Sequence, residues 1–234
     1  MLMEKRKFDT LLFDLDGTLV DSSEGITDSV RFALEHYGIR PSSREELYRF
    51  IGPPLVDSFM RFCGFSREQA GEATDIYRSR YRVKGVYENR VYDGIKETLS
   101  ALNEMGVTCA LATSKPEIFA NTVLDDMGLR PYISFAAGAE LDDAEGRKRR
   151  LRSEKAEVVA YALESLGSAD KTRVLMVGDR LHDIEGARAN AIPSAGVLWG
   201  FGNREELETA GADYIVNSPS ELIGIVLGQA LSRR

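Results

Sequence analysis

Residues 13–20 place two carboxylates where side chains of this type and spacing can do chemistry. Asp14 and Asp16 follow the apolar pair Leu11-Leu12, and Gly17 comes directly after them. Because residues i and i+2 of a strand point to the same side, we expect both carboxylates at the carboxyl edge of a sheet. Two buried like charges repel each other unless a cation or a shared proton offsets them. The pair therefore indicates a metal site, or a nucleophile beside an acid/base.

An ordinary turn or part of a calcium loop is the alternative for this segment, because Asp-x-Asp-Gly suits both. The calcium loop fails on spacing, since Gly25 stands where the twelfth position requires Glu. Thr18, at the fifth position of such a loop, also supplies only a hydroxyl, whereas the calcium loop has oxygen-rich ligands at positions one, three and five. The plain turn is disfavoured because later segments agree with a catalytic interpretation.

Three later segments could complete such a site. Thr113 and Ser114 follow an apolar run at a helix start, where hydroxyls and free N–H groups suit a phosphoryl oxygen. Asp179 and Asp183 follow another apolar run and would extend the carboxylates into a cluster that can hold Mg²⁺. Lys155 opens a helix and is the best candidate for a cation that binds an anionic ester. Taken singly, each of these segments is more typical of a helix cap or a solvated surface charge.

The elements that would position these residues alternate between strand and helix beyond about residue 92. We expect strands at 8–13, 107–112, 132–136, 173–177, 192–198 and 213–216. We expect helices at 95–105, 116–127, 155–166, 184–190 and 219–230. Strands separated by helices of this length are typical of βαβ units and a parallel sheet.

Residues 21–89 have a different pattern. Helical spacing is expected at 26–37, 44–50, 55–63 and 67–82, and Ser66-x-x-Gln69 is typical of a capping box. The first strand lies before this block and the remaining strands after it. We therefore expect an α/β core formed by residues 1–20 and 90–234, with a helical cap of residues 21–89 inserted after the first strand.

Composition limits the class of protein. The chain has 234 residues, 43% hydrophobic content and a net charge of −7, which is ample for a buried core and excludes disorder. The acidic balance argues against a nucleic-acid or membrane partner. Cys63 and Cys109 form no disulfide framework, and the N-terminus lacks the apolar region of a signal peptide. A soluble, cytoplasmic protein is expected.

The order of the motifs resembles the haloacid dehalogenase-like superfamily of phosphohydrolases. The chain reads Asp-x-Asp-Gly-Thr, then Thr/Ser, then Lys, then Gly-Asp-x-x-x-Asp, and the resemblance covers roughly residues 8–217. It implies a Rossmann-like parallel sheet flanked by helices, with an all-helical cap of the phosphoglycolate phosphatase-like or 5′-nucleotidase-like type. The segment 51–55, with Gly52 and Pro53, resembles the cap loop that faces the substrate in that family.

The resemblance also implies a role for each motif. Asp14 would attack phosphorus and form an aspartyl-phosphate, and Asp16 would protonate the leaving group and then activate water. The phosphoryl oxygens would be bound by Thr113, the Ser114 amide and Lys155. Mg²⁺ would be held by Asp14, the backbone carbonyl of Asp16 and Asp179, and Asp183 would complete the metal site by holding a metal-bound water or a neighbouring ligand.

One segment departs from the family pattern, because residues 142–152 form a longer and more basic connection than is usual. A solvated loop with balanced charges is the favoured interpretation. The alternative hypothesis is that Arg147, Arg149 or Arg152 reaches a second anionic group of the substrate.

The expected function is Mg²⁺-dependent hydrolysis of a phosphomonoester of a small phosphorylated metabolite. A phosphoglycolate phosphatase-like activity is expected first, a 5′-nucleotidase next, and then a pyrophosphatase or phosphomutase. A phospho-accepting signalling domain also uses Asp, Mg²⁺, Thr/Ser and Lys, but Asp16 and the cap speak against it. The chain is expected to be a monomer or a homodimer.

Overall fold

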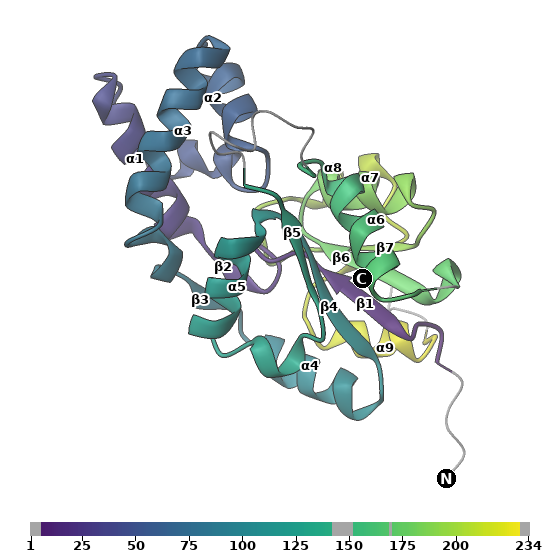
Figure 1. The fold of residues 1–234 in the computed structure, drawn as a ribbon. Coiled ribbons are helices and arrows are strands. Elements are labelled where there is room, and N and C mark those ends of the chain that lie inside the picture. Colours follow the sequence, from purple (N-terminus) through teal and green to yellow (C-terminus); the bar gives the residue numbers. More distant parts are fainter. Residues whose placement is uncertain (1–5, 142–151, 169, 230–234) are drawn as a thin grey trace.

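A computed structural model describes residues 6–141, 152–168 and 170–229 (Figure 1). Its main sheet has six strands in the order β5-β4-β1-β6-β7-β8, and every neighbouring pair is parallel. The strands are β1 (Thr10–Phe13), β4 (Thr108–Pro116), β5 (Ala136–Ala139), β6 (Val174–Gly178), β7 (Ser194–Val197) and β8 (Tyr214–Val216). The predicted parallel α/β fold is therefore confirmed.

Helices cover both faces of this sheet. One face carries α6 (Lys155–Ser165) and α7 (Leu181–Ala189); the other carries α4 (Ile95–Glu104), α5 (Glu117–Asp126) and α9 (Glu221–Val226). In β1, Leu11 and Phe13 pack with the residues of α4 and α5, whereas Leu12 packs with those of α6. A strand that is buried on both faces must be apolar at every position, which explains the continuous apolar run before Asp14.

Three helices stand apart from the sheet as a separate bundle (Figure 1). They are α1 (Ser23–His36), α2 (Leu55–Cys63) and α3 (Arg67–Tyr81), with 3₁₀ turns at η1 (Glu45–Phe50) and η2 (Gly85–Tyr87). The chain enters and leaves this bundle through the antiparallel pair β2 (Val20–Asp21) and β3 (Arg90–Val91), in which Val20 lies opposite Val91. We take this bundle as the cap and retain the boundaries 21–89 as a proposal.

Some local predictions were right and others wrong. The Ser66–Gln69 capping box is present at the start of α3. The strand expected at 132–136 was wrong, because Arg130–Tyr132 form a 3₁₀ turn (η3) that contains Pro131, and β5 begins at Ala136. Strand β5 consists of Ala and Gly only, since a side chain at Gly138 would overlap the backbone of Glu117. Such small residues carry no strand-like pattern.

The helix α8 (Arg204–Ala210) was not anticipated from the sequence. Its residues are mostly polar, and only Leu207 and Ala210 are buried, against Ile184 of α7. The Asn203 side chain accepts a hydrogen bond from the Glu206 amide at 2.9 Å. This N-cap and the left-handed Gly211 that ends the helix were the signals that the sequence carried. No helix in the described ranges is long and apolar enough to cross a membrane.

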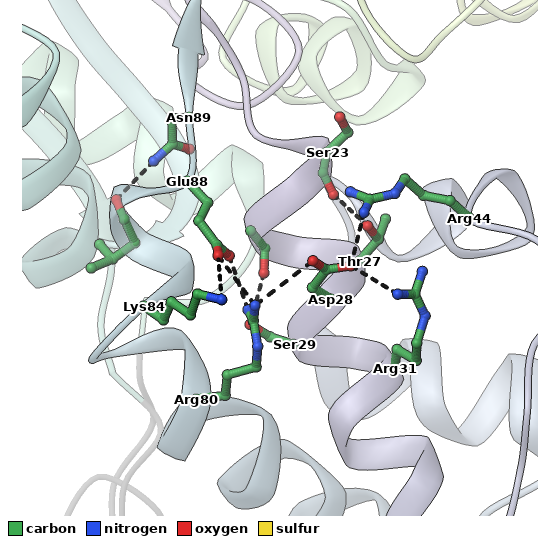
Figure 2. A network of polar contacts seen from close by, with 12 residues as sticks. Ser23, Thr27, Asp28, Ser29, Arg31, Arg44, Arg80, Lys84, Glu88 and Asn89 are labelled. Atoms are coloured by element: carbon green, nitrogen blue, oxygen red, sulfur yellow. Dashed lines mark hydrogen bonds and ion pairs between the residues drawn. The ribbon is translucent and has the colours of Figure 1, made fainter.

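A polar network at the base of the cap joins α1, α3 and the segment that returns to the sheet (Figure 2). Arg80 of α3 lies at its centre and donates to both carboxylate oxygens of Glu88, at 3.0 and 3.2 Å. The same guanidinium donates to the Ser29 hydroxyl at 3.0 Å and lies 3.7 Å from Asp28. Arg80 and Glu88 side chains are only 15% and 16% exposed, so this pair is shielded from water.

Replacing Arg80 with Ala is expected to lower the free energy of unfolding by about 2 kcal/mol at pH 7, because the mostly buried Glu88 loses two hydrogen bonds and keeps, among the described residues, only Lys84 as a partner, at 3.3 Å. Burial would raise the pKa of Glu88, but the hydrogen bonds and charges of Arg80 and, to a smaller extent, Lys84 hold it below its usual value. The stabilisation that the Arg80–Glu88 pair provides is therefore fully present above the ordinary pKa of Glu. It is lost as the pH falls through the lowered pKa of Glu88. Urea unfolding at several pH values measures both effects.

Arg31→Ala is the matched control, because Arg31 pairs with Asp28 in the same network but its side chain is 37% exposed. Its loss should stay within about 0.5 kcal/mol at all pH values. Equal losses for the two variants would contradict a special role for Arg80.

Candidate active site

The turn after β1 holds the first carboxylates at the carboxyl edge of the sheet. Asp14 donates its amide to the Val177 carbonyl of β6 at 2.9 Å, and the side chains of Asp14 and Asp16 are buried. Gly17 has φ +81°, and a side chain there would overlap the Asp179 carboxylate. Glycine is thus required at this position for both backbone conformation and space, and it lets the ends of β1 and β6 close on each other.

Asp14, Asp179 and Asp183 form a buried carboxylate cluster, in which one oxygen of each lies within 4.8 Å of the others. Burial raises the pKa of Asp179 well above its usual value, and the Asp183 and Asp14 charges raise it further. Burial and the Asp14 charge likewise raise the pKa of Asp183, against the effect of Lys155. An oxygen-rich cluster that carries this much repulsion fits Mg²⁺. The Asp16 carboxylate is not part of this group.

Lys155, the first residue of α6, lies among these carboxylates. Its ammonium is 2.7 Å from Asp14 Oδ1 and 2.8 Å from Asp183 Oδ1, and it donates to the Ala112 carbonyl at 3.1 Å. Burial alone would lower the pKa of Lys155, but Asp14 and Asp183 raise it above the usual value. The side chain therefore carries a fixed positive charge at the point where an anionic ester would react.

The expected phosphoryl-binding residues lie on a strand rather than at a helix start. β4 continues to Pro116 with an irregularity after Thr113, and α5 begins only at Glu117. The Thr113 side chain is buried and its hydroxyl accepts from the Lys115 amide at 3.2 Å. Thr113 also directly follows Ala112, whose carbonyl accepts from Lys155. The helix expected at 116–127 is confirmed, but the placement of Thr113 and Ser114 at its start was wrong, because both lie on β4.

A cavity of about 970 Å³ lies between cap and core. The predicted cap residues Gly52 and Pro53 line it, together with Asp16, Ser114 and Lys115 of the core. The same cap loop contacts the core, because Arg180 donates from Nη1 to the Ile51 carbonyl at 2.9 Å. The sequence-based assignment of this loop to the substrate stays a prediction.

Lys115 is a residue that the sequence reasoning missed. Its ammonium lies 2.8 Å from both carboxylate oxygens of Asp16, and both side chains are more than 90% buried. A signal was available, because Thr113 and Lys115 are two residues apart on a strand and so share a side. Reading residues 113–116 as a helix start concealed that signal.

Arg152, one of the basic residues proposed to reach the substrate, is engaged elsewhere. Its guanidinium donates to the Gly138 carbonyl at 2.8 Å and to Glu117 at 3.1 Å, and it stacks over the Tyr161 ring at 3.8 Å. Among the described residues that line the cavity, Arg152 is absent. Arg147 and Arg149 lie outside the described residues.

Comparison with known proteins gives a consistent family match. The family model described as "Haloacid dehalogenase-like hydrolase" matches residues 11–197. A 5′-nucleotidase of Pseudomonas aeruginosa is 44% identical over 86% of this chain and 87% of its own length. Tyrosine-protein kinase PtkA of Mycobacterium tuberculosis is 36% identical over 89% of this chain and 68% of its own length. The crystal structure of a predicted phosphatase from Clostridium acetobutylicum covers 94% of this chain and 99% of its own, with 43% identity and a TM-score of 0.87.

Proposed function

The chain belongs to the haloacid dehalogenase-like hydrolases and is a phosphatase, and on that premise we propose that it hydrolyses phosphomonoesters in a Mg²⁺-dependent reaction through an aspartyl-phosphate at Asp14. The observation that carries the proposal is the position of Lys155, which lies between Asp14 and Asp183 inside a buried carboxylate cluster. A carboxylate that attacks a phosphate dianion meets strong repulsion, and a fixed cation beside it lowers that barrier.

The carboxylates of Asp14 and Asp16 have different roles in the proposed reaction. Asp14 forms a bond to phosphorus while the bond to the leaving oxygen breaks, and Asp16 gives a proton to that oxygen. Asp16 then takes a proton from a water molecule, which attacks phosphorus and releases Asp14. When bound by Asp14, Asp179, Asp183 and the Asp16 carbonyl, Mg²⁺ supplies further neutralisation of charge on the phosphoryl group. The Thr113 hydroxyl, the Ser114 amide and Lys155 bind the phosphoryl oxygens.

The cavity size bears on the substrate. A volume of about 970 Å³ would remain largely empty around the two-carbon acid 2-phosphoglycolate, which the sequence resemblance favours, and suits a nucleoside. The relative named 5′-nucleotidase supports the second candidate. We therefore propose two candidate substrates, 2-phosphoglycolate and a 5′-nucleotide. The monomeric or homodimeric state and the cytoplasmic location stay predictions.

Phosphate release from a panel of esters, with and without Mg²⁺, tests this function. The panel holds 2-phosphoglycolate, 5′-nucleotides, sugar phosphates and pyrophosphate. Mg²⁺-dependent release with a clear preference in kcat/KM supports the proposal. A separate reaction with ATP and a tyrosine peptide tests the activity that the PtkA name describes. Peptide phosphorylation without release from any ester would contradict the proposal, as would stimulation of sugar-phosphate isomerisation by a bisphosphate without net release.

Mg²⁺ is expected to stabilise the protein by binding to the cluster. At a concentration about 100 times its Kd, the metal should raise the free energy of unfolding by about 2.7 kcal/mol. Asp179→Asn removes one carboxylate from the cluster and should abolish most of the resulting rise in Tm. Asp93→Asn is the control, because Asp93 is exposed and not part of the cluster. A rise in Tm that is equal in both variants would place the metal elsewhere.

A further inference from the structure

Lys115 and two tyrosines of the cap surround the carboxylate of Asp16. Tyr77 and Tyr81 of α3 stack with ring centroids 5.3 Å apart, and the Lys115 ammonium lies 5.0 Å from the Tyr81 ring centroid. All four residues line the cavity between cap and core. The proposed proton donor therefore lies in a small chamber that is formed jointly by β4 and the cap helix α3.

The hydroxyl of Tyr81 is buried and has no hydrogen-bond partner in the described part of the chain. The Tyr81 ring faces the Lys115 ammonium, which contacts the Asp16 carboxylate, and burial together with the Asp16 charge raises the pKa of Tyr81 well above its usual value. A buried hydroxyl without a partner costs free energy, and natural proteins rarely leave one. A ligand oxygen brought against this hydroxyl would give it the partner that it lacks.

The Lys115–Asp16 pair is not explained by stability. Moving two charges out of water costs about as much as their attraction returns, so a buried ion pair is weak evidence for a structural role. The pair also occupies Asp16, which must contact the leaving oxygen during the reaction. The Lys115 ammonium must therefore either stay on Asp16 while the substrate binds or move from Asp16 to the substrate.

Geometry limits what the ammonium can reach. It lies 2.8 Å from the Asp16 oxygens, and the leaving oxygen must come within a hydrogen-bond length of the same carboxylate. Lys115 Nζ and the leaving oxygen are then at most about 6 Å apart, two hydrogen-bond lengths. If the ester carries an oxygen on the carbon next to the esterified carbon, that oxygen extends into the space between the leaving oxygen and Lys115 Nζ.

We propose that Lys115 and Tyr81 form a leaving-group subsite that selects esters with an oxygen acceptor on the carbon next to the esterified carbon. The inference rests on the proposed phosphatase function and specifies its substrate class. The carboxylate of 2-phosphoglycolate and the ribose ring oxygen of a 5′-nucleotide both supply this acceptor. Ethyl phosphate lacks it.

Three kinds of ester separate the roles that Lys115 can have. 2-Phosphoglycolate and 5′-AMP carry the acceptor and need a proton on the leaving oxygen. Ethyl phosphate needs the proton but has no acceptor, and p-nitrophenyl phosphate needs neither. In Lys115→Met we expect kcat/KM to fall about 10- to 100-fold for the acceptor-bearing ester that the wild type prefers, and less than about 3-fold for the other two kinds. A fall with 2-phosphoglycolate would identify the acceptor as a carboxylate, and a fall with 5′-AMP would identify it as a sugar oxygen.

Two further variants control this experiment. Lys96→Met removes an exposed lysine of α4 and should change none of the rates. Tyr81→Phe keeps the ring and removes only the hydroxyl, so it should lower kcat/KM several-fold for the same acceptor-bearing ester alone. This variant tests the subsite even if Lys115→Met folds poorly.

Other outcomes would overturn the inference. An equal loss for ethyl phosphate and the acceptor-bearing ester, with p-nitrophenyl phosphate unchanged, would mean that Lys115 only orients Asp16. A loss with all three kinds of ester would assign it a structural role. A wild-type protein that is inactive towards every ester would instead contradict the proposed function, and the subsite with it.

Discussion

Replacing Asp14 with Asn is expected to abolish phosphate release, with kcat falling by about 10⁴-fold or more. The amide has nearly the size of the carboxylate but cannot act as a nucleophile towards phosphorus. The change also removes one charge from a cluster in which Asp179 and Asp183 already repel each other, so the fold should persist. Steady-state phosphate release with the preferred ester, with folding checked by circular dichroism, measures the effect.

Asp9→Asn is the matched control for this variant. Asp9 lies five residues earlier, before β1, and pairs with Arg173 outside the cluster, at 2.6 Å between Oδ1 and Nη2. Its replacement should leave kcat within about 2-fold of the wild type, because surface substitutions away from special features have small effects. Near-normal turnover by Asp14→Asn would show that another residue is the nucleophile.

Replacing Lys155 with Met is expected to impair both catalysis and stability. The variant leaves Asp14 and Asp183 facing each other without the ammonium that now lies 2.7 and 2.8 Å from them. Breaking a buried pair in this way costs about 3–5 kcal/mol of unfolding free energy. Loss of one preorganised cation beside the reacting phosphoryl group should lower kcat by about 10²- to 10³-fold.

Mg²⁺ provides the test that links these two effects. Because the variant cluster carries one more net negative charge, Mg²⁺ should raise its Tm by more than it raises that of the wild type. Thermal unfolding with and without Mg²⁺ measures this difference. Lys171→Met, at an exposed position in the 3₁₀ turn Lys171–Arg173, is the control and should behave as the wild type. A Lys155→Met protein as stable and active as the wild type would contradict the account.

The sequence predicted the residues of the site that lie next to strand ends. Asp14 and Asp179 each come directly after a buried strand, and Asp183 lies in the first turn of the helix that follows Asp179, so that parallel strands bring all three to one edge of the sheet. Lys155 was assigned to this edge only through the order of motifs and the charge that an anionic ester requires. The structure brings its ammonium to Asp14 and Asp183 from the first turn of α6.

The sequence could not predict the chamber around Asp16. Lys115 is 99 positions from Asp16, and Tyr81 comes from a cap helix whose orientation depends on the packing of the whole bundle. Periodicity reports which face of an element is buried and not which residue of another element meets it. For the same reason the free hydroxyl of Tyr81 became evident only from the structure.

Detection of a phosphoryl group on Asp14 is the most direct test of the central claim. The protein is mixed with the preferred ester and Mg²⁺, quenched in acid within one turnover, reduced with borohydride and digested with trypsin. Cleavage after Lys7 and Arg31 releases one peptide that contains both Asp14 and Asp16. Mass spectrometry of its fragments should locate homoserine, the reduction product of an aspartyl-phosphate, at Asp14 and not at Asp16. Rapid phosphate release with no modified aspartate, or with the modification at Asp16, would contradict the account.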